Sequence, residues 1–270
     1  AVSENSLALY RAGSGEPVVL VHGFTGTWHH WRPVLADLVA RYEVIAPTLA
    51  GHDGGPPFPA DLEMTFASAA DSFERHLDDL GVGTAHFVGN SLGGGTSVRF
   101  ALNYGRRAGR LVLMAPGGLM MNLFHADPTE GIKKLFAFAA PPGPSKQKLA
   151  EFLRTMVFDP SLITDELVEE RYRSAADPET LKGMAAMGAT FADPAMADEG
   201  MLWREAHKLR QRVLLVWGRE DRVNPLDGGL VALKQIPRAQ LHVFGQCGHW
   251  AMLEKFDEFN RLTADFLLEG

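Results

Sequence analysis

A serine, an acid and a histidine stand in this sequence in an order and in surroundings that suit nucleophilic catalysis. Gly89-Asn90-Ser91-Leu92-Gly93 matches the G-x-S-x-G pattern, in which a serine occupies a tight turn between a strand and a helix. A serine hydroxyl is inert at neutral pH unless a base removes its proton and a third group orients that base. The sequence offers Glu220 or Asp221 as the acid and His249 as the base. This order predicts a Ser-acid-His triad built on Ser91.

The position of each residue relative to the predicted strands separates these candidates from their competitors. Ser91 follows an apolar strand ending at Val88 and precedes an amphipathic helix, which favours a nucleophile over a structural glycine-rich turn. His249 follows the last predicted strand, where a catalytic histidine can overhang the edge of a sheet. Four other histidines lie in loops but lack that position: His22, His29, His30 and His52.

Two backbone N–H groups are predicted to form an oxyanion hole. One belongs to Leu92, directly after the nucleophile, and the other to Phe24, in His22-Gly23-Phe24-Thr25-Gly26. Such donors stabilise charge that develops in the transition state, and each contributes roughly 3–4 kcal/mol in measured deletions. The alternative interpretation of His22-Gly23 is a tight turn after a strand. The nucleophile motif elsewhere in the chain favours the functional interpretation.

The elements that must position these residues alternate along the chain. Helical patterns, for example at 68–80 and 92–104, separate short apolar runs. Six such runs are predicted as strands, at 17–22, 42–46, 85–89, 111–115, 213–217 and 241–244. Continuous apolar strands are typical of a parallel sheet covered on both faces. The predicted fold class is therefore α/β, with a mainly parallel sheet flanked by helices.

One long segment interrupts this alternation. Between about Leu119 and Leu209 the sequence shows helical patterns and Pro-Gly turns but no convincing strand. We predict a helical lid at 119–209, inserted between core strands of a catalytic domain that comprises 1–118 and 210–270. The aromatic and methionine side chains of this segment collectively predict an apolar pocket roof. Any single one of them is better explained as part of the lid's own core.

Composition and charge narrow the expected partners. The 270 residues carry a formal net charge of −7, which argues against nucleic acid or an acidic membrane as a main partner. No run approaches 18 apolar residues, so no membrane span is predicted. A single cysteine, Cys247, and no visible signal peptide predict a cytoplasmic protein. Neither metal-ligand spacing nor a dinucleotide motif is present, so no metal and no cofactor are expected.

From Gly89 onward, over about two thirds of the chain, the sequence resembles the meta-cleavage product hydrolases, closest to the steroid-degrading members. These α/β-hydrolase-fold enzymes cut a C–C bond in ring-opened aromatic or steroid catabolites. The Cys-Gly-His-Trp and Pro-Gly-Gly-Leu stretches are more specific than the triad motifs. The matching segments are Gly89–Gly95, Pro116–Leu119, Pro160–Thr164, Met201–Glu205, Gly218–Asp227 and Cys247–Trp250.

The resemblance implies a role for each matching residue. Ser91 is implied as the nucleophile, His249 as the acid and base, and Asp221, in preference to Glu220, as the acid that orients it. The implied substrate-binding residues are Asn90 and Trp250 in the pocket and Arg171 at the carboxylate and dienolate end of the substrate.

Helical spacing supports Arg171 independently of the resemblance. In a helix that begins near residue 164, Arg171 falls on the apolar stripe with Val168 and Ala175. A guanidinium on that stripe faces inward and needs an anion, whereas Arg173 lies off the stripe. The alternative is an internal salt bridge that holds the lid.

The first third of the chain departs from the family pattern. Residues 1–88 are more similar to generic bacterial esterases of the same fold. The family carries a Trp-x-Asn motif that helps to hold the dienolate, and counting from His22 places Pro33 at that asparagine.

Two activities therefore compete, and one enzyme can have both. The first is hydrolysis of a C–C bond in a 2-hydroxy-6-oxo-dienoate, and the second is carboxylester hydrolysis through an acyl-Ser91 intermediate. The expected partner is a small apolar substrate with a carboxylate or ester group, and the resemblance suggests a homo-oligomer. A non-catalytic receptor on this fold is disfavoured by the complete triad. Haloalkane or epoxide chemistry would need an aspartate in place of Ser91.

Overall fold

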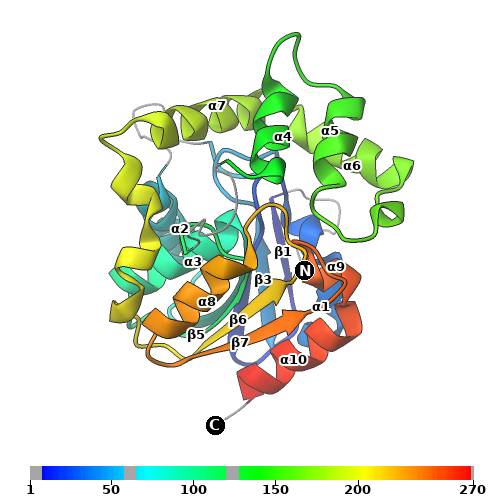
Figure 1. Ribbon diagram of the computed structural model, residues 1–270. Helices are drawn as coiled ribbons and strands as arrows, with labels where there is room; N and C mark the ends of the chain where they lie inside the picture. Colours follow the sequence, from blue (N-terminus) through cyan, green and yellow to red (C-terminus); the bar gives the residue numbers. More distant parts are fainter. Residues whose placement is uncertain (1–7, 58–64, 120–127, 269–270) are drawn as a thin grey trace.

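The computed structural model describes residues 8–57, 65–119 and 128–268. Within these residues the centre of the molecule is a seven-stranded sheet with helices on both faces (Figure 1). Its strands are β1 (Leu9–Ala12), β2 (Pro17–Val21), β3 (Glu43–Pro47), β4 (Ala85–Asn90), β5 (Ala108–Met114), β6 (Val213–Gly218) and β7 (Ala239–Phe244). In space they follow the order β1-β3-β2-β4-β5-β6-β7, and β1 alone pairs antiparallel. The mainly parallel α/β fold is confirmed.

All six predicted strands are present, and one strand was missed. β1 has only four residues, and each of them is partly buried rather than alternating between inside and outside. It pairs with β3 on one side only, at the edge of the sheet. A short edge strand needs no continuous apolar run, so nothing in its sequence separates it from a loop.

The described residues form ten α-helices, which flank the sheet or lie in the segment between β5 and β6. They are α1 (Arg32–Val39), α2 (Phe66–Asp79), α3 (Leu92–Asn103), α4 (Glu130–Ala139), α5 (Lys146–Leu153), α6 (Asp165–Ala175), α7 (Pro178–Ala192), α8 (Leu226–Gln235), α9 (Ala251–Glu254) and α10 (Phe256–Leu268). Five short 3-10 helices join them: η1 (Trp28–Trp31), η2 (Pro160–Leu162), η3 (Ala197–Gly200), η4 (Leu202–Arg204) and η5 (Ala206–Lys208).

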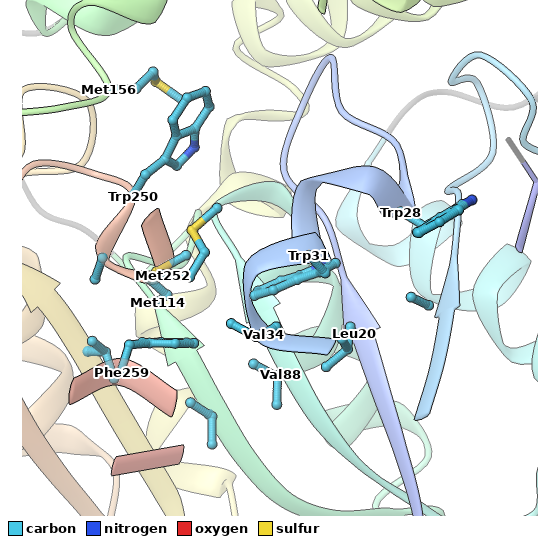
Figure 2. Close-up of a cluster of buried hydrophobic side chains, with 14 of the residues drawn as sticks. Leu20, Trp28, Trp31, Val34, Val88, Met114, Met156, Trp250, Met252 and Phe259 are labelled. Carbon is cyan, nitrogen blue, oxygen red and sulfur yellow. The ribbon is translucent and has the colours of Figure 1, made fainter. Parts of the chain in front are cut away.

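The central strands β2, β4 and β6 bury both of their faces, which explains their unbroken apolar runs. Val18 and Leu20 of β2 point into one cluster with α1 and α10, part of which Figure 2 shows around Trp31 and Phe259. The alternate residues of β2 point into a second cluster, with α2, α3 and α8. Each fully buried aliphatic or phenylalanine side chain contributes about 1.5–3 kcal/mol. This burial fixes the sheet whose strand ends carry the site residues.

The described residues between β5 and β6 form helices and turns, as predicted, with no strand among them. Helices α4 to α7 lie together over one edge of the sheet (Figure 1). We call residues 128–200 the helical insertion. Phe138 and Phe152 are buried in it, whereas Phe136 and Phe158 are 44% and 47% exposed, so its aromatic side chains do not all form one roof. η4 and η5, which follow, instead pack against the core through Leu202 and Ala206.

In the part of the chain that the structure describes, no helix combines the length and the apolar character that crossing a membrane requires.

Candidate active site

Ser91 lies at a sharp turn between β4 and α3, as the nucleophile motif predicts. Its backbone φ is +52° and its ψ −116°, a conformation that costs a non-glycine residue about 1–3 kcal/mol. The turn is closed by small residues, because a Cβ added to Gly93 would come within 2.1 Å of the Val21 carbonyl oxygen. A Cβ on Gly89 would lie 2.7 Å from the Gly93 oxygen. Larger residues at either glycine would therefore push α3 away from the sheet and move Ser91.

Asp221 and His249 meet beyond the ends of β6 and β7. Nδ1 of His249 lies 2.7 Å from Oδ2 of Asp221, and both side chains are fully buried. The other oxygen of Asp221 accepts hydrogen bonds from the backbone N–H groups of Val223 and Asn224, at 2.7 and 2.9 Å. Glu220 contacts Arg219 and the Cys247 amide instead. The structure therefore pairs the histidine with Asp221 and not with Glu220.

The second ring nitrogen of His249, Nε2, is buried and has no hydrogen-bond partner among the described residues. A hydrogen bond from the Ser91 hydroxyl to this nitrogen is accordingly not formed in this structure. In unliganded hydrolases this bond is often long and shortens when substrate binds. The open nitrogen leaves His249 free to take a proton from a hydroxyl or from water.

Backbone contacts with the helical insertion hold the histidine loop. The carbonyl oxygen of Met156 accepts hydrogen bonds from the amides of His249 and Trp250, at 2.8 and 3.2 Å. The carboxylate of Glu254 bridges the same two parts. It accepts from the amides of Phe158 and Gly248, both at 2.6 Å. The catalytic loop and residues 156–158 of the insertion thus form one hydrogen-bonded unit.

The loop after β2 passes directly beside the nucleophile, where an oxyanion hole was predicted. A Cβ added to Gly23 would lie 3.4 Å from the Cβ of Ser91 and 3.0 Å from Oδ1 of Asn90. Phe24 follows this glycine, so its backbone enters the neighbourhood of Ser91. Leu92 is the first residue of α3, where a backbone N–H has no acceptor within its own helix. Both predicted donors therefore lie in segments adjacent to the serine.

Three buried histidines surround this loop. Burial lowers the pKa of His22 and of His30 well below 6.5, and it lowers the pKa of His52 to about 4. His22 is structural, because Nδ1 donates to the Gly23 carbonyl oxygen and Nε2 accepts from the Leu49 amide, at 2.7 and 2.9 Å. All three rings are therefore neutral near pH 7.

We expect the free energy of unfolding to decrease as the pH falls from about 6.5 toward 4. A histidine whose pKa is lower when folded stabilises the fold above its unfolded pKa, and that stability is lost as the pH falls through the folded pKa. For His52, a shift from 6.5 to about 4 corresponds to about 3 kcal/mol. Urea unfolding at pH 7 and pH 4.5 measures the change.

His52→Gln is the matched variant, since it removes the titrating group. Carboxylates titrate in the same range in both proteins, so the comparison isolates the histidine. The variant should lose less stability between the two pH values than the wild type. Equal losses would contradict this assignment.

Arg171 is a buried cation with no anionic partner. It lies on α6 and is 9% exposed, while Arg173 on the same helix has a side chain that is 75% exposed. Among the described residues no carboxylate lies within ion-pair distance of Arg171, and its Nε is buried without a hydrogen-bond partner. Its neighbour Glu170 pairs with Arg32. Burial lowers the pKa of Arg171 to about 10, so the guanidinium is charged at neutral pH.

Arg171, Trp250 and His30 contact one another, and we call them the arginine cluster. Nη1 of Arg171 lies 3.2 Å from Nδ1 of His30. The guanidinium carbon stands 5.5 Å from the centroid of the Trp250 ring, and the rings of His30 and Trp250 meet edge to face at 5.1 Å. Trp250 follows His249 in the chain, so the cluster lies next to the histidine that pairs with Asp221.

Asn90 is placed differently from the arginine cluster. It is fully buried beside Ser91, and its Nδ2 donates to the Met114 carbonyl oxygen at 3.2 Å. Its Oδ1 and the Nε1 of Trp250 are buried without partners among the described residues. A cavity of about 710 Å³ reaches Arg171 from outside, with Thr25 and Ser174 among its lining residues. The described residues contain no group of three or more His, Cys, Asp or Glu arranged to hold a metal ion.

The fold and this geometry define an α/β hydrolase. The family model described as alpha/beta hydrolase fold matches residues 16–256. The chain is 39% identical over 282 residues to a 2-hydroxy-6-oxo-6-phenylhexa-2,4-dienoate hydrolase of Burkholderia cepacia, covering 100% of this chain and 95% of that protein. It is also 39% identical to a 2-hydroxy-6-oxononadienedioate/2-hydroxy-6-oxononatrienedioate hydrolase of Comamonas testosteroni, with the same coverage.

The solved structure of a meta-cleavage product hydrolase from Pseudomonas fluorescens is similar throughout. The TM-score is 0.82 at 33% identity, over 98% of this chain and 97% of that one. The similarity thus extends through the first third of the chain, beyond the range that the motifs from Gly89 onward indicated. The protein is an enzyme that belongs to the α/β hydrolases and, among them, to the meta-cleavage product hydrolases.

Proposed function

We propose that this enzyme hydrolyses the C–C bond beside the distal ketone of a 2-hydroxy-6-oxo-dienoate. The observation that carries the proposal is the buried guanidinium of Arg171, which lies against Trp250 and His30 and has no anionic partner among the described residues. A charge buried without a partner destabilises a protein, so an anion that binds there offsets the cost. The names of the relatives from Burkholderia and Comamonas support a dienoate, which carries a carboxylate at one end.

Each residue of the site has a role in this proposal. Arg171 binds the carboxylate of the substrate, and Asn90 and Trp250 line the pocket. His249, oriented by Asp221, moves protons. The amides of Phe24 and Leu92 stabilise the oxyanion, and helices α4 to α7 act as a lid over the site.

The reaction consumes one water and needs no redox partner. The dienol is first converted to its keto form, as its hydroxyl proton moves to carbon with the help of His249. Ser91, or a water activated by His249, then attacks the distal ketone. The C–C bond breaks, the electron pair leaves with the dienolate, and a proton from His249 converts the dienolate to the hydroxydienoate product, which keeps its carboxylate. With Ser91 as nucleophile, water finally releases the acid from the acyl-serine.

Ester hydrolysis is the second candidate function, because it uses the same triad and oxyanion donors. An ester without a carboxylate makes no use of Arg171. The ester therefore serves as the reference substrate in the experiments below. We also infer a small-molecule substrate and a cytoplasmic site of action, which the single, buried Cys247 fits.

The Arg171→Ala variant tests the proposal through a comparison of a substrate that has a carboxylate with one that lacks it. We expect kcat/KM for a synthetic 2-hydroxy-6-oxo-6-phenyl-dienoate to fall roughly 30- to 5,000-fold, the 2–5 kcal/mol expected when one partner of a buried charge pair is lost. Turnover of a short-chain p-nitrophenyl ester should change less than about threefold. Because the buried guanidinium has no anionic partner among the described residues, thermal stability should not decrease.

Arg173→Ala is the matched control, since Arg173 lies on the same helix but faces solvent. It should leave both activities within about twofold. Wild-type enzyme that does not turn over the dienoate would overturn the C–C assignment. An equal loss of both activities in Arg171→Ala would mean that Arg171 holds the lid rather than the substrate.

A further inference from the structure

The loop that carries His249 is held from outside at three consecutive backbone amides. The amide of Gly248 donates to Oε2 of Glu254 at 2.6 Å. The next two amides, of His249 and Trp250, donate to one carbonyl oxygen, that of Met156. The packing here is close, since a Cβ added to Gly248 would lie 2.9 Å from the same carbonyl oxygen. Two partners therefore fix the backbone on which the imidazole stands.

Of these two partners, Glu254 is the one that acts through its side chain. It is the last residue of α9 and is half-buried. Its second oxygen, Oε1, accepts from the amides of Phe158 and Asp159, at 2.6 and 3.2 Å. Three backbone N–H groups thus converge on one carboxylate, and hydrogen bonds to an ionised acceptor are stronger than those between neutral groups. One side chain joins the histidine loop to the helical insertion.

Residues 154–159 of the insertion are also bonded to the loop of the acid. Nη2 of Arg222 donates to the carbonyl oxygens of Arg154 and Val157. Arg222 follows Asp221 in the chain, so the same stretch is bonded to the loop of the acid and to the loop of the histidine. It is a common support for both.

The side chain of Met156 contributes to the same support. Met156 and Trp250 are both buried in one hydrophobic cluster (Figure 2). Substitution of Met156 would change this packing but would leave its carbonyl oxygen in place. A substitution at Glu254, in contrast, removes the hydrogen bonds themselves.

We propose that Glu254 is a positioning residue, whose carboxylate joins the insertion to the histidine loop and thereby sets where Nε2 of His249 lies. The inference rests on the proposed function, because it takes His249 as the group that moves protons. A base must lie within hydrogen-bond distance of the proton that it removes. A misplacement of about 1 Å can lower the rate roughly 100-fold. Glu254 acts through the backbone of Gly248 and not by contact with the reacting atoms.

The Glu254→Ala variant removes the acceptor of all three amides at once. We expect kcat to fall roughly 10- to 100-fold on both the dienoate and the p-nitrophenyl ester, because both reactions use His249. KM should change less than about threefold, because Arg171 on α6 and Asn90 on β4 are not part of the histidine loop. Steady-state kinetics well below the unfolding temperature gives both constants, and circular dichroism gives the folded fraction to which kcat is normalised.

Glu254→Gln distinguishes positioning from packing. A glutamine side chain has nearly the same shape, but only its amide oxygen accepts hydrogen bonds. It can accept from Gly248 or from the amides of the insertion, but not from both. We expect an intermediate loss of kcat, roughly three- to tenfold. Glu258→Ala is the matched control, because Glu258 is an exposed glutamate on the next helix, α10, and it should keep kcat within about twofold.

Three results would overturn the proposal. One is a normalised kcat within twofold of the wild type in Glu254→Ala, and another is a rise in KM with kcat unchanged. Should the alanine variant fail to fold, an unchanged kcat in Glu254→Gln would be the third.

The proposed function fails separately. Wild-type enzyme that turns over the ester but not the dienoate would remove the C–C reaction, while the ester still reports on Glu254. A large loss of ester turnover in His249→Ala with none in Glu254→Ala would remove only the role of Glu254.

Discussion

Ser91→Ala is expected to lower kcat by roughly 10⁴- to 10⁶-fold on both the dienoate and the ester, the range measured when a triad serine is removed elsewhere. The variant loses the hydroxyl, while the strained turn is held by glycines that remain. Binding of 2-oxopentanoate, a short acid whose carboxylate can occupy the site at Arg171, should be unchanged, because the arginine cluster contains no atom of Ser91. Stopped-flow absorbance for the dienoate and calorimetry for the acid provide the two measurements.

Ser97→Ala is the control for this substitution. Ser97 lies on α3, and its buried hydroxyl donates to the Gly93 carbonyl oxygen at 2.7 Å. Removing that bond costs about 1 kcal/mol of stability and should leave kcat within a few-fold of the wild type. Ester turnover that survives unchanged in Ser91→Ala would disprove the nucleophile assignment. A slow dienoate reaction with a lost ester reaction would instead favour a water activated by His249 as the nucleophile on the ketone.

Asp221→Asn is expected to lower kcat about 10⁴-fold with little effect on KM, as the same change does in other Ser-His-Asp enzymes. The amide of an asparagine can keep the two backbone hydrogen bonds from Val223 and Asn224. It cannot stabilise an imidazolium, and its N–H favours the wrong tautomer of His249. The pH dependence of kcat and the circular dichroism spectrum together separate this loss from a folding defect.

Glu220→Gln is the control for the acid. Glu220 competes with Asp221 in the sequence, but its carboxylate binds the Cys247 amide and Arg219 rather than His249. We expect kcat within about threefold of the wild type. A larger loss in Glu220→Gln than in Asp221→Asn would reverse the assignment of the acid.

Much of the fold was predictable because its signals are local. The apolar runs of β2 and β4 to β6 reflect burial on both faces, and the spacing of Val168, Arg171 and Ala175 correctly placed the arginine inside. The antiparallel edge strand β1 was not predictable, because its only pairing is with β3 and its residues are half-buried.

The acid and the histidine were predictable because they lie in recognisable motifs in a fixed order along the chain. Contacts between residues that are far apart in the sequence were not predictable. The pairing of His249 with Asp221 followed from motifs. The contact between His30 and Arg171 did not, because the two residues lie 141 positions apart in sequence. A signal was present: aligning the loop on Trp28, rather than counting from His22, places His30 and not Pro33 at the asparagine of the Trp-x-Asn motif.

The hydrogen bonds between Met156 and the loop that carries His249 limit which parts of the helical insertion can be replaced. The Phe158 and Gly248 amides both donate to the Glu254 carboxylate, so a graft that replaced residues 156–158 without Glu254 would displace the loop that carries His249. Among the described residues, helix α7 carries no such bond to the histidine loop. Helix α4 is bonded to the loop after Asp221, because the Gly131 amide donates to the Arg222 carbonyl oxygen. Exchange among homologous enzymes, by recombination or by design, should therefore tolerate a foreign α7 while requiring that residues 156–158 be inherited together with the C-terminal end.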